Sequence, residues 1–288
     1  MDGCLLHTRI DGVSSDLPAV VLEAGNGSIL PIWDLLAQQL TSHMRVFSYE
    51  RAGVGSSEGG GAGCAEVAAR LSALLDSPQV KAQLKRPVIL VGHSLGGLYA
   101  RYFAATHARD VAGLVLLDTT PDDMVLPPTL LRISRILLWG MHLAARSGIL
   151  QRLLDWGLVG DASQGSVEAQ LKAISRAGHI RAVLGELRVL PRTQRDVAAQ
   201  GPPRDLPVLC VSAGVRPRVV RSSAAPMQRS HDRLAAAGSP PWSRHQCIAD
   251  ATHMGLLSDP RHAEVVGKMI LEFARQISPG APLPGEIP

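Results

Sequence analysis

The sequence has 288 residues, of which 46% are hydrophobic and 19% charged, and its formal net charge is +4 at pH 7. This composition provides ample apolar material for a folded core. The basic residues are scattered and never form a run of five, so we expect no nucleic-acid binding.

The four cysteines lie far apart and form no Cys-x-x-Cys pair: Cys4, Cys64, Cys210 and Cys247. This spacing argues against a metal cluster or a disulfide framework, and we expect no cofactor and no metal. The first residues lack a basic region followed by a long apolar stretch, and no window has the length and apolarity of a membrane span. We therefore expect a cytoplasmic protein.

Apolar segments alternate with amphipathic ones through the first 120 residues. Strands are expected at 5–10, 19–23, 45–49, 88–91 and 113–117. Helical apolar spacing occurs at 32–40, 66–75 and about 97–106. Strands that alternate with helices in this way predict a mostly parallel sheet with helices on both faces.

The alternation stops between about 121 and 203, where the pattern favours several helices and no strand. Strand character returns at 206–212, and 246–248 is expected to be the last strand. A closing helix is expected at 262–277. The proline-rich residues 278–288 are expected to form a disordered tail.

The strand at 88–91 runs directly into Gly92-His93-Ser94-Leu95-Gly96 and then into a helix. A Gly-x-Ser-x-Gly sequence in this context places a serine on a sharp turn that small neighbours permit, with its hydroxyl clear of the sheet. A second match, Gly55-Ser56-Ser57-Glu58-Gly59, continues into further glycines with no immediate helix. The context therefore favours Ser94 as a nucleophile.

A series of motifs in this order resembles the alpha/beta-hydrolase superfamily over nearly the whole chain. The motifs are Glu-Ala-Gly-Asn-Gly, Tyr-Glu-Arg-Ala-Gly-Val-Gly-Ser, Val-Gly-His-Ser-Leu-Gly-Gly, Leu-Val-Leu-Leu-Asp and Ala-Thr-His. The resemblance implies an alpha/beta-hydrolase fold, with a mostly parallel central sheet and a helical lid inserted after the sixth strand. It assigns residues 1–120 and 204–277 to the core and 121–203 to the lid.

Members of this superfamily carry their catalytic triad in the order serine, acid, histidine. His253 is the expected base, because it lies between the last strand and the closing helix. His245 precedes that strand, and His262 opens the helix, so both are weaker candidates. His93 adjoins the serine on the wrong side of the turn to accept its proton.

The acid is harder to place. The superfamily most often has it after the seventh strand, but here Val215, Arg216, Pro217 and Arg218 follow that strand, with no carboxylate before Asp232. A subset, which includes haloalkane dehalogenases and some lipases, has the acid after the sixth strand, where this chain has Asp118. We expect Asp118 to orient the histidine. The open alternatives are Asp122, Asp123 and Asp232, and a purely structural role for Asp118.

An oxyanion hole needs two main-chain N–H groups aimed at the developing charge. Leu95 is expected to supply one. Asn26, or else Gly27, is expected to supply the other from the loop after the early strand. Glu50-Arg51 resembles the Asp-Arg pair of the superfamily, and we expect a structural ion pair near the site.

The segment 130–143 has a wide apolar face with Arg132, Arg135 and His142 on its narrow polar side. We expect this face to pack over the active site and line a pocket for an acyl or hydrocarbon group. Contact with a membrane surface is the alternative.

These residues predict a serine hydrolase that cleaves carboxylic esters of small or lipid-like substrates through an acyl-enzyme. An amidase or peptidase of the proline iminopeptidase type is an alternative within the enzyme class. A non-catalytic, hydrolase-like binding protein is the alternative from another class, because the usual acid position is empty. Epoxide hydrolases and haloalkane dehalogenases are disfavoured, since they carry Asp where this chain has Ser94. The sequence leaves the oligomeric state open.

Overall fold

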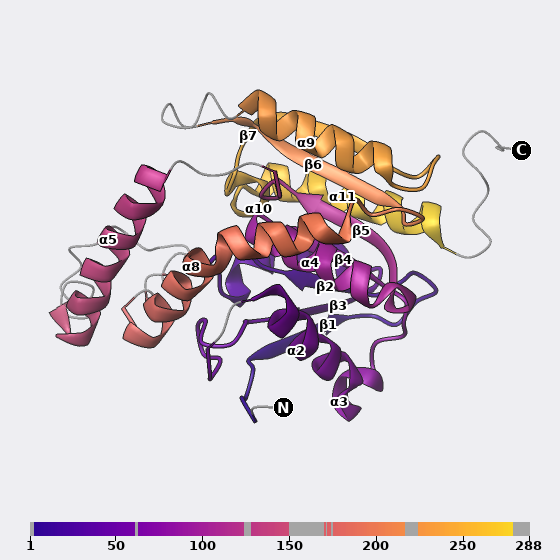
Figure 1. Cartoon of the computed structure of the whole chain (residues 1–288). Helices are drawn as coiled ribbons and strands as arrows, with labels where there is room; N and C mark the ends of the chain where they lie inside the picture. The colour runs from indigo at the N-terminus through magenta and orange to yellow at the C-terminus, as the bar shows by residue number, and fades with distance from the viewer. Residues whose placement is uncertain are drawn as a thin grey trace, which may run out of the picture.

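The computed structural model describes residues 3–60, 63–123, 128–149, 170, 172–173, 175–216 and 224–278. Its strands are β1 (Thr8–Gly12), β2 (Val20–Glu23), β3 (Arg45–Tyr49), β4 (Val88–His93), β5 (Val111–Leu117), β6 (Val208–Val215) and β7 (Arg244–Thr252). They form one seven-stranded sheet in the order β1-β3-β2-β4-β5-β6-β7 (Figure 1). Only β1 runs antiparallel to its neighbour, so the predicted mostly parallel sheet is confirmed for the described residues.

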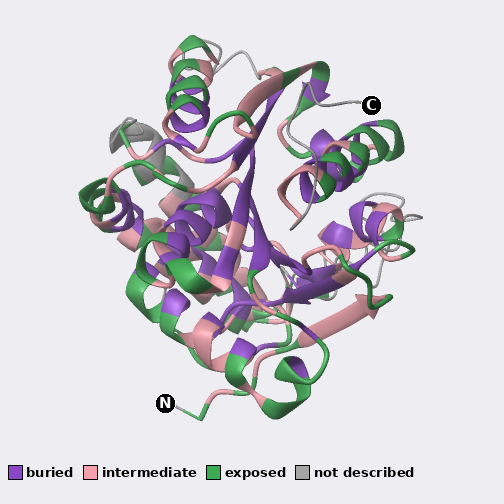
Figure 2. Ribbon diagram, turned by 90° about the vertical axis from the view of Figure 1, so that its right-hand side faces the viewer, coloured by how far each residue is buried: buried purple, intermediate pink, exposed green. Residues whose placement is uncertain are grey.

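The central strands are buried on both faces, as their continuous apolar sequences predict. Successive side chains of a strand point to opposite faces. Val20, Leu22, Ile89 and Val91 therefore join one apolar cluster, while the alternate residues of these strands join the other. Figure 2 shows the buried sheet between more exposed helices.

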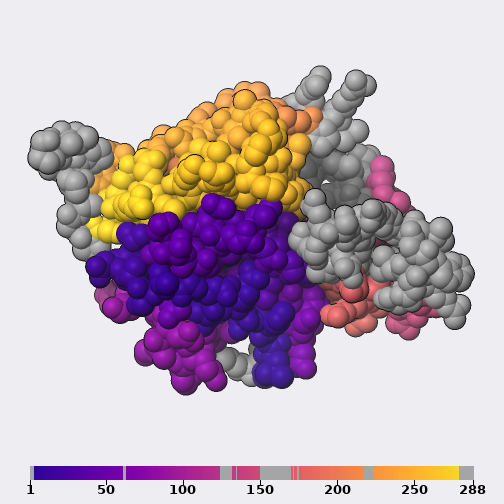
Figure 3. Space-filling view, turned by 180° about the vertical axis from the view of Figure 1, so that it is seen from behind, coloured from indigo at the N-terminus to yellow at the C-terminus, as the bar shows by residue number. Residues whose placement is uncertain are grey.

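Helices cover both faces of the sheet. Helices α1 (Asp34–Leu40) and α11 (Pro260–Ile277) pack with the first cluster and against each other. Figure 3, the view from behind, shows C-terminal residues (yellow) against N-terminal residues (indigo). Helices α2 (Cys64–Asp76), α4 (Leu95–Thr106) and α9 (Ala224–Ala237) pack with the second. The short elements are η1 (Leu30–Trp33), α3 (Pro78–Lys81), η2 (Ala108–Asp110) and α10 (Gly255–Ser258).

The largest differences from the sequence-based expectations lie at the two edges of the sheet and in one helix. The first strand begins at Thr8 rather than residue 5, because its pairing with β3 runs from Thr8 to Gly12. The last strand extends over Arg244–Thr252 instead of 246–248, because it pairs with β6 along most of its length. Helix α9 was not predicted at all.

Strands β5 and β6 of this chain take the places that the sequence analysis gave to the sixth and seventh strands of the superfamily. Two long helices lie between them, where the lid was expected: α5 (Pro128–Arg146) and α8 (Ala177–Gln200). Residues 124–127 and 150–169 of the expected lid, and 279–288 of the expected tail, lie outside the described residues. Helix α5 packs against α8 and stands away from the sheet (Figure 1). No helix in the described segments has the length and apolarity needed to cross a membrane.

The expected packing of the apolar face of α5 over the active site is wrong. Ile136 and Leu137 are 67% and 64% exposed. One polar contact joins the helix to α8: His142 Nδ1 lies 3.0 Å from the main-chain oxygen of Ala177.

Candidate active site

Ser94 lies on a strained turn between β4 and α4. Its φ of 54° and ψ of −121° fall in a region that non-glycine residues rarely adopt. Glycines make the turn possible: a Cβ on Gly92 would lie 2.6 Å from the Cα of Gly97, and one on Gly96 would overlap the main-chain oxygen of Glu23. The geometry is that of the nucleophile elbow the motif predicted.

Asp118 lies beside this turn because of the strand register. In the parallel pair of β4 and β5, His93 is opposite Leu117, so Ser94 and Asp118 both follow the carboxyl ends of neighbouring strands. The Ser94 N–H donates to the main-chain oxygen of Leu117 at 3.1 Å. Asp118 also has a positive φ, 44°, and its side chain is fully buried.

The structure brings Asp118 and His253 together. His253 follows β7, and its Nδ1 lies 2.6 Å from Oδ2 of Asp118, with the ring 35% exposed. A carboxylate accepts, so Nδ1 carries the proton and Nε2 is left as the basic nitrogen. Burial raises the pKa of Asp118, but hydrogen bonds from His253 and Arg216 outweigh it, and the pKa falls below its usual range.

The alternative acids lie elsewhere. Asp122 pairs with Arg101, with 2.9 Å between Oδ1 and a guanidinium nitrogen. Asp123 pairs with the exposed Arg233, and Asp232 with His245 at 2.6 Å. Among the candidate acids only Asp118 therefore contacts the expected base.

His253 also contacts the turn through His93. The Nε2–H of His93 donates to the main-chain oxygen of His253 at 3.1 Å, and the two rings lie 4.6 Å apart. Since Ser94 follows His93 in the chain, this contact links the segment that carries the base to the turn that carries the serine. The Ser94 hydroxyl forms no hydrogen bond with any described residue.

The loop expected to supply one N–H group of the oxyanion hole lies close to Ser94. A Cβ on Gly25 would lie 3.3 Å from the Cβ of Ser94, which brings the loop of Asn26 against the serine. The Gly27 N–H is occupied by Glu186 Oε2 at 3.3 Å, which favours Asn26 over Gly27. In the described part of the chain, neither the Asn26 nor the Leu95 N–H donates to another main-chain group.

A buried network that the sequence did not predict fixes this loop. Arg51 donates to Glu23 and Glu186, each at 2.6 Å, and to the main-chain oxygens of Ala24 and Gly25. Glu186 belongs to α8 and accepts from the Asn26 side chain at 2.7 Å. The expected pairing of Glu50 with Arg51 is wrong, because Glu50 accepts from main-chain N–H groups of Leu30 and Ser56.

A second serine, histidine and aspartate form a chain of hydrogen bonds between β6, β7 and α9. Ser212 Oγ lies 2.8 Å from His245 Nε2, and His245 Nδ1 lies 2.6 Å from Asp232 Oδ1. Ser212 is completely buried within β6, so no substrate reaches its hydroxyl. The hydrogen bonds of this group resemble those of a catalytic triad, but the burial of Ser212 excludes it as an active site.

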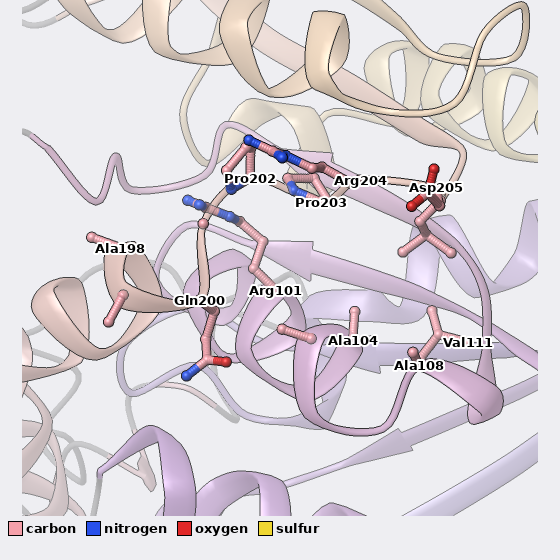
Figure 4. Close-up of a pocket in the computed structure, with 14 residues that line it drawn as sticks. Arg101, Ala104, Ala108, Val111, Ala198, Gln200, Pro202, Pro203, Arg204 and Asp205 are labelled. Carbon is pink, nitrogen blue, oxygen red and sulfur yellow. The ribbon is translucent and has the colours of Figure 1, made fainter.

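A cavity of about 620 Å³ lies between α4, the end of α8 and the segment that follows it (Figure 4). Arg101, Gln200 and Arg204 line it, and none of the candidate catalytic residues does. The Arg101 charge is matched by Asp122. The candidate active site is therefore defined by the contacts around Ser94, Asp118 and His253, and not by this cavity. No cluster of three metal-ligating side chains occurs among the residues that the structure describes.

Comparison with known proteins agrees with the fold. The model of the alpha/beta hydrolase family matches residues 20–266. The chain is 32% identical over 123 residues to the Bacillus subtilis protein YqjL, which covers 43% of this chain and 47% of that protein. It is 35% identical over 117 residues to the pimeloyl-[acyl-carrier protein] methyl ester esterase of Vibrio cholerae, covering 40% of this chain and 41% of the esterase. The matches thus span less than half the length of these curated relatives.

Solved structures share the architecture at low identity. The enol-lactonase from Burkholderia xenovorans LB400 aligns with a TM-score of 0.68 and 20% identity, over 94% of this chain and 97% of that chain. An esterase from Thermogutta terrifontis aligns with a TM-score of 0.66 and 20% identity, over 95% and 94%. These likenesses concern the fold. Because the family model extends from β2 into α11, the chain belongs to the alpha/beta hydrolase family.

Proposed function

We propose that this protein is a serine hydrolase that cleaves carboxylic esters of small or lipid-like substrates. The observation that carries the proposal is the 2.6 Å contact between Asp118 and the Nδ1 of His253, next to a strained serine. A serine hydroxyl is a weak nucleophile at neutral pH and needs a base whose tautomer is fixed. The esterase among the curated relatives supports an ester as substrate.

In this mechanism the Ser94 Oγ attacks the ester carbonyl while His253 Nε2 takes the hydroxyl proton. The tetrahedral oxyanion accepts hydrogen bonds from the Asn26 and Leu95 N–H groups, at the N-terminus of α4. His253 then returns the proton to the leaving alcohol, and Ser94 keeps the acyl group. A water molecule, deprotonated by His253, hydrolyses this ester and restores the free enzyme.

Two alternatives have less support. An amidase or peptidase of the proline iminopeptidase type needs a free carboxylate for a substrate amine, whereas Glu23 and Glu186, the buried carboxylates near the oxyanion loop, both pair with Arg51. The non-catalytic alternative was motivated by the empty acid position. Asp118 beside His253 removes that motive.

Turnover of p-nitrophenyl esters of graded acyl length tests the proposal. Ser94→Ala should abolish turnover across the series. Ser212→Ala is the matched control, because it removes the hydroxyl of the other serine–histidine pair, and it should retain turnover. Equal activity of Ser94→Ala and the native protein would refute the proposal, and the acyl length with the highest kcat/KM would identify the substrate class.

We also propose that the chain contacts anionic membrane surfaces through α5. This helix has no acidic residue, carries Arg132 and Arg146, and exposes Ile133, Ile136 and Leu137. An apolar face flanked by basic residues is typical of helices that lie in the membrane interface. A cytoplasmic location remains part of the proposal and rests on the sequence alone.

A further inference from the structure

Arg216 directly follows β6, at the position where the resemblance to the alpha/beta-hydrolase superfamily implied a triad acid. Its guanidinium binds the acid that this chain carries elsewhere. One terminal nitrogen donates to Asp118 Oδ2 at 2.5 Å, and the other donates to Oδ1. The Arg216 side chain is 6% exposed and Asp118 is fully buried, so solvent screens this pair little.

The two oxygens of Asp118 are shared between three partners. Oδ1 accepts from Arg216 and from the Ala213 N–H at 3.2 Å, and Oδ2 accepts from Arg216 and His253 Nδ1. A planar guanidinium that grips both oxygens fixes the plane of the carboxylate. Because His253 bonds to that same carboxylate, the grip also fixes the direction of the imidazole.

The charges around Asp118 come from few groups. His93 on β4 is buried, and burial together with the nearby His253 lowers its pKa to about 3, so it is neutral. Burial also lowers the pKa of His231 on α9, whose Nε2 bonds to the main-chain oxygen of Thr119. In the described segments, Arg216 is therefore the permanent cation in contact with Asp118, and His253 is its other side-chain partner.

This arrangement has a consequence for the base. A buried carboxylate alone strongly favours the imidazolium form of a bonded histidine, and an imidazolium cannot accept the serine proton. A permanent positive charge on the other side of the carboxylate offsets that attraction and repels a second cation. Arg216 thus keeps the carboxylate as an orienting group and weakens its pull on the proton.

We propose that Arg216 is a positioning residue that clamps Asp118 against His253 and, through its charge, keeps the imidazole neutral and able to accept the Ser94 proton at lower pH. This inference rests on the proposed ester hydrolysis. It also gives a function to the arginine that this chain has at the usual position of the acid: Arg216 and Asp118 act together on His253.

The pH profile of kcat/KM separates the charge from the grip. Arg216→Gln removes both, so the midpoint of the acid limb should move up by about one pH unit and the plateau should fall. Arg216→Lys keeps the charge but loses the two-point contact of the guanidinium with both Asp118 oxygens. The kcat/KM plateau should therefore fall, while the midpoint of the acid limb stays near the native one. Arg233→Gln, which breaks an exposed pair with Asp123, is the matched control and should leave both unchanged.

Thermal unfolding of each variant is measured alongside. An Arg216→Gln protein with the native acid-limb midpoint would overturn the inference, even if its plateau and stability fall, because a merely structural arginine predicts that result. If Arg216→Gln does not fold, Arg216→Met decides, since it also removes the charge: a midpoint displaced upward there would support the charge effect, and the native midpoint would contradict it. Failure of the proposed function itself is distinct, because the native protein would then show no ester turnover.

Discussion

The Nε2–H of His93 donates to the main-chain oxygen of His253, so the residue before the candidate nucleophile holds the segment that carries the candidate base. This bond joins the ends of β4 and β7, which are far apart in the order of the sheet. The His93 ring is 1% exposed, and its other nitrogen, Nδ1, has no hydrogen-bond partner. A neutral ring fits this environment, and a charged one does not.

The first prediction follows from that burial, which with His253 lowers the pKa of His93 from 6.5 to about 3. Between these values the unfolded chain binds a proton at residue 93 and the native protein does not, so native stability falls as the pH falls. In His93→Gln, whose amide can still donate to His253, urea unfolding between pH 6.5 and 3 should show a shallower decline, by up to about 1.4 kcal/mol per pH unit. Parallel stability curves for the two proteins would contradict this.

The second prediction concerns the acid. Asp118→Asn should lower kcat by about 10⁴-fold, because an amide no longer selects the tautomer that leaves Nε2 basic. It should also lower the free energy of unfolding by about 3–5 kcal/mol, since Arg216 loses its buried partner. Ester kinetics and urea titration measure the two effects. Asp232→Asn, the control at the second histidine, should keep native kcat, and a large loss there would count against the assignment.

The third prediction concerns the turn. Gly92→Ala places a Cβ against the main chain of Gly97, so it should cost about 1–3 kcal/mol of stability and displace Ser94. Turnover should fall with it. Gly140→Ala is the control in α5, where a Cβ would meet nothing within 4 Å, and it should be neutral or stabilise by about 0.5–1 kcal/mol. Full activity in Gly92→Ala would argue against a strained elbow.

The fourth prediction concerns α5. Native protein should sediment with vesicles that contain phosphatidylglycerol and bind less to pure phosphatidylcholine, with binding that weakens as salt rises. Leu137→Glu should reduce this binding, because it puts a charge on the exposed apolar face. Val265→Glu makes the same change at an exposed residue of α11 and should leave binding intact. Equal loss in both variants, or no binding by native protein, would refute the contact.

Local sequence patterns predicted the central strands of the sheet well and the bounds of its edge strands poorly. Strand β5 is a continuous apolar run, so 113–117 was found within two residues of its bounds, and 45–49 matches β3. Strand β7 contains Arg244, His245 and Gln246 and pairs with β6 along one side only, so its sequence lacks the apolar signal. Helix α9 contains a proline and few large apolar residues, which hid its period.

The candidate site was also predicted only in part from the sequence. Ser94, Asp118 and His253 each follow a strand, and position relative to a strand can be read from the sequence. Arg216 and Glu186 have no local signature, since their partners Asp118 and Arg51 lie 98 and 135 residues away. The outward face of α5 was also missed, because amphipathic spacing gives a face and not its direction.

The most direct test of the account is the identity of the residue that a fluorophosphonate modifies. Native protein and Ser212→Ala should each gain one covalent adduct, and peptide mass spectrometry should place it on Ser94. Ser94→Ala, folded by circular dichroism, should gain none. An adduct that persists in Ser94→Ala, or a folded native protein that gains no adduct, would contradict the assignment of Ser94 as the nucleophile.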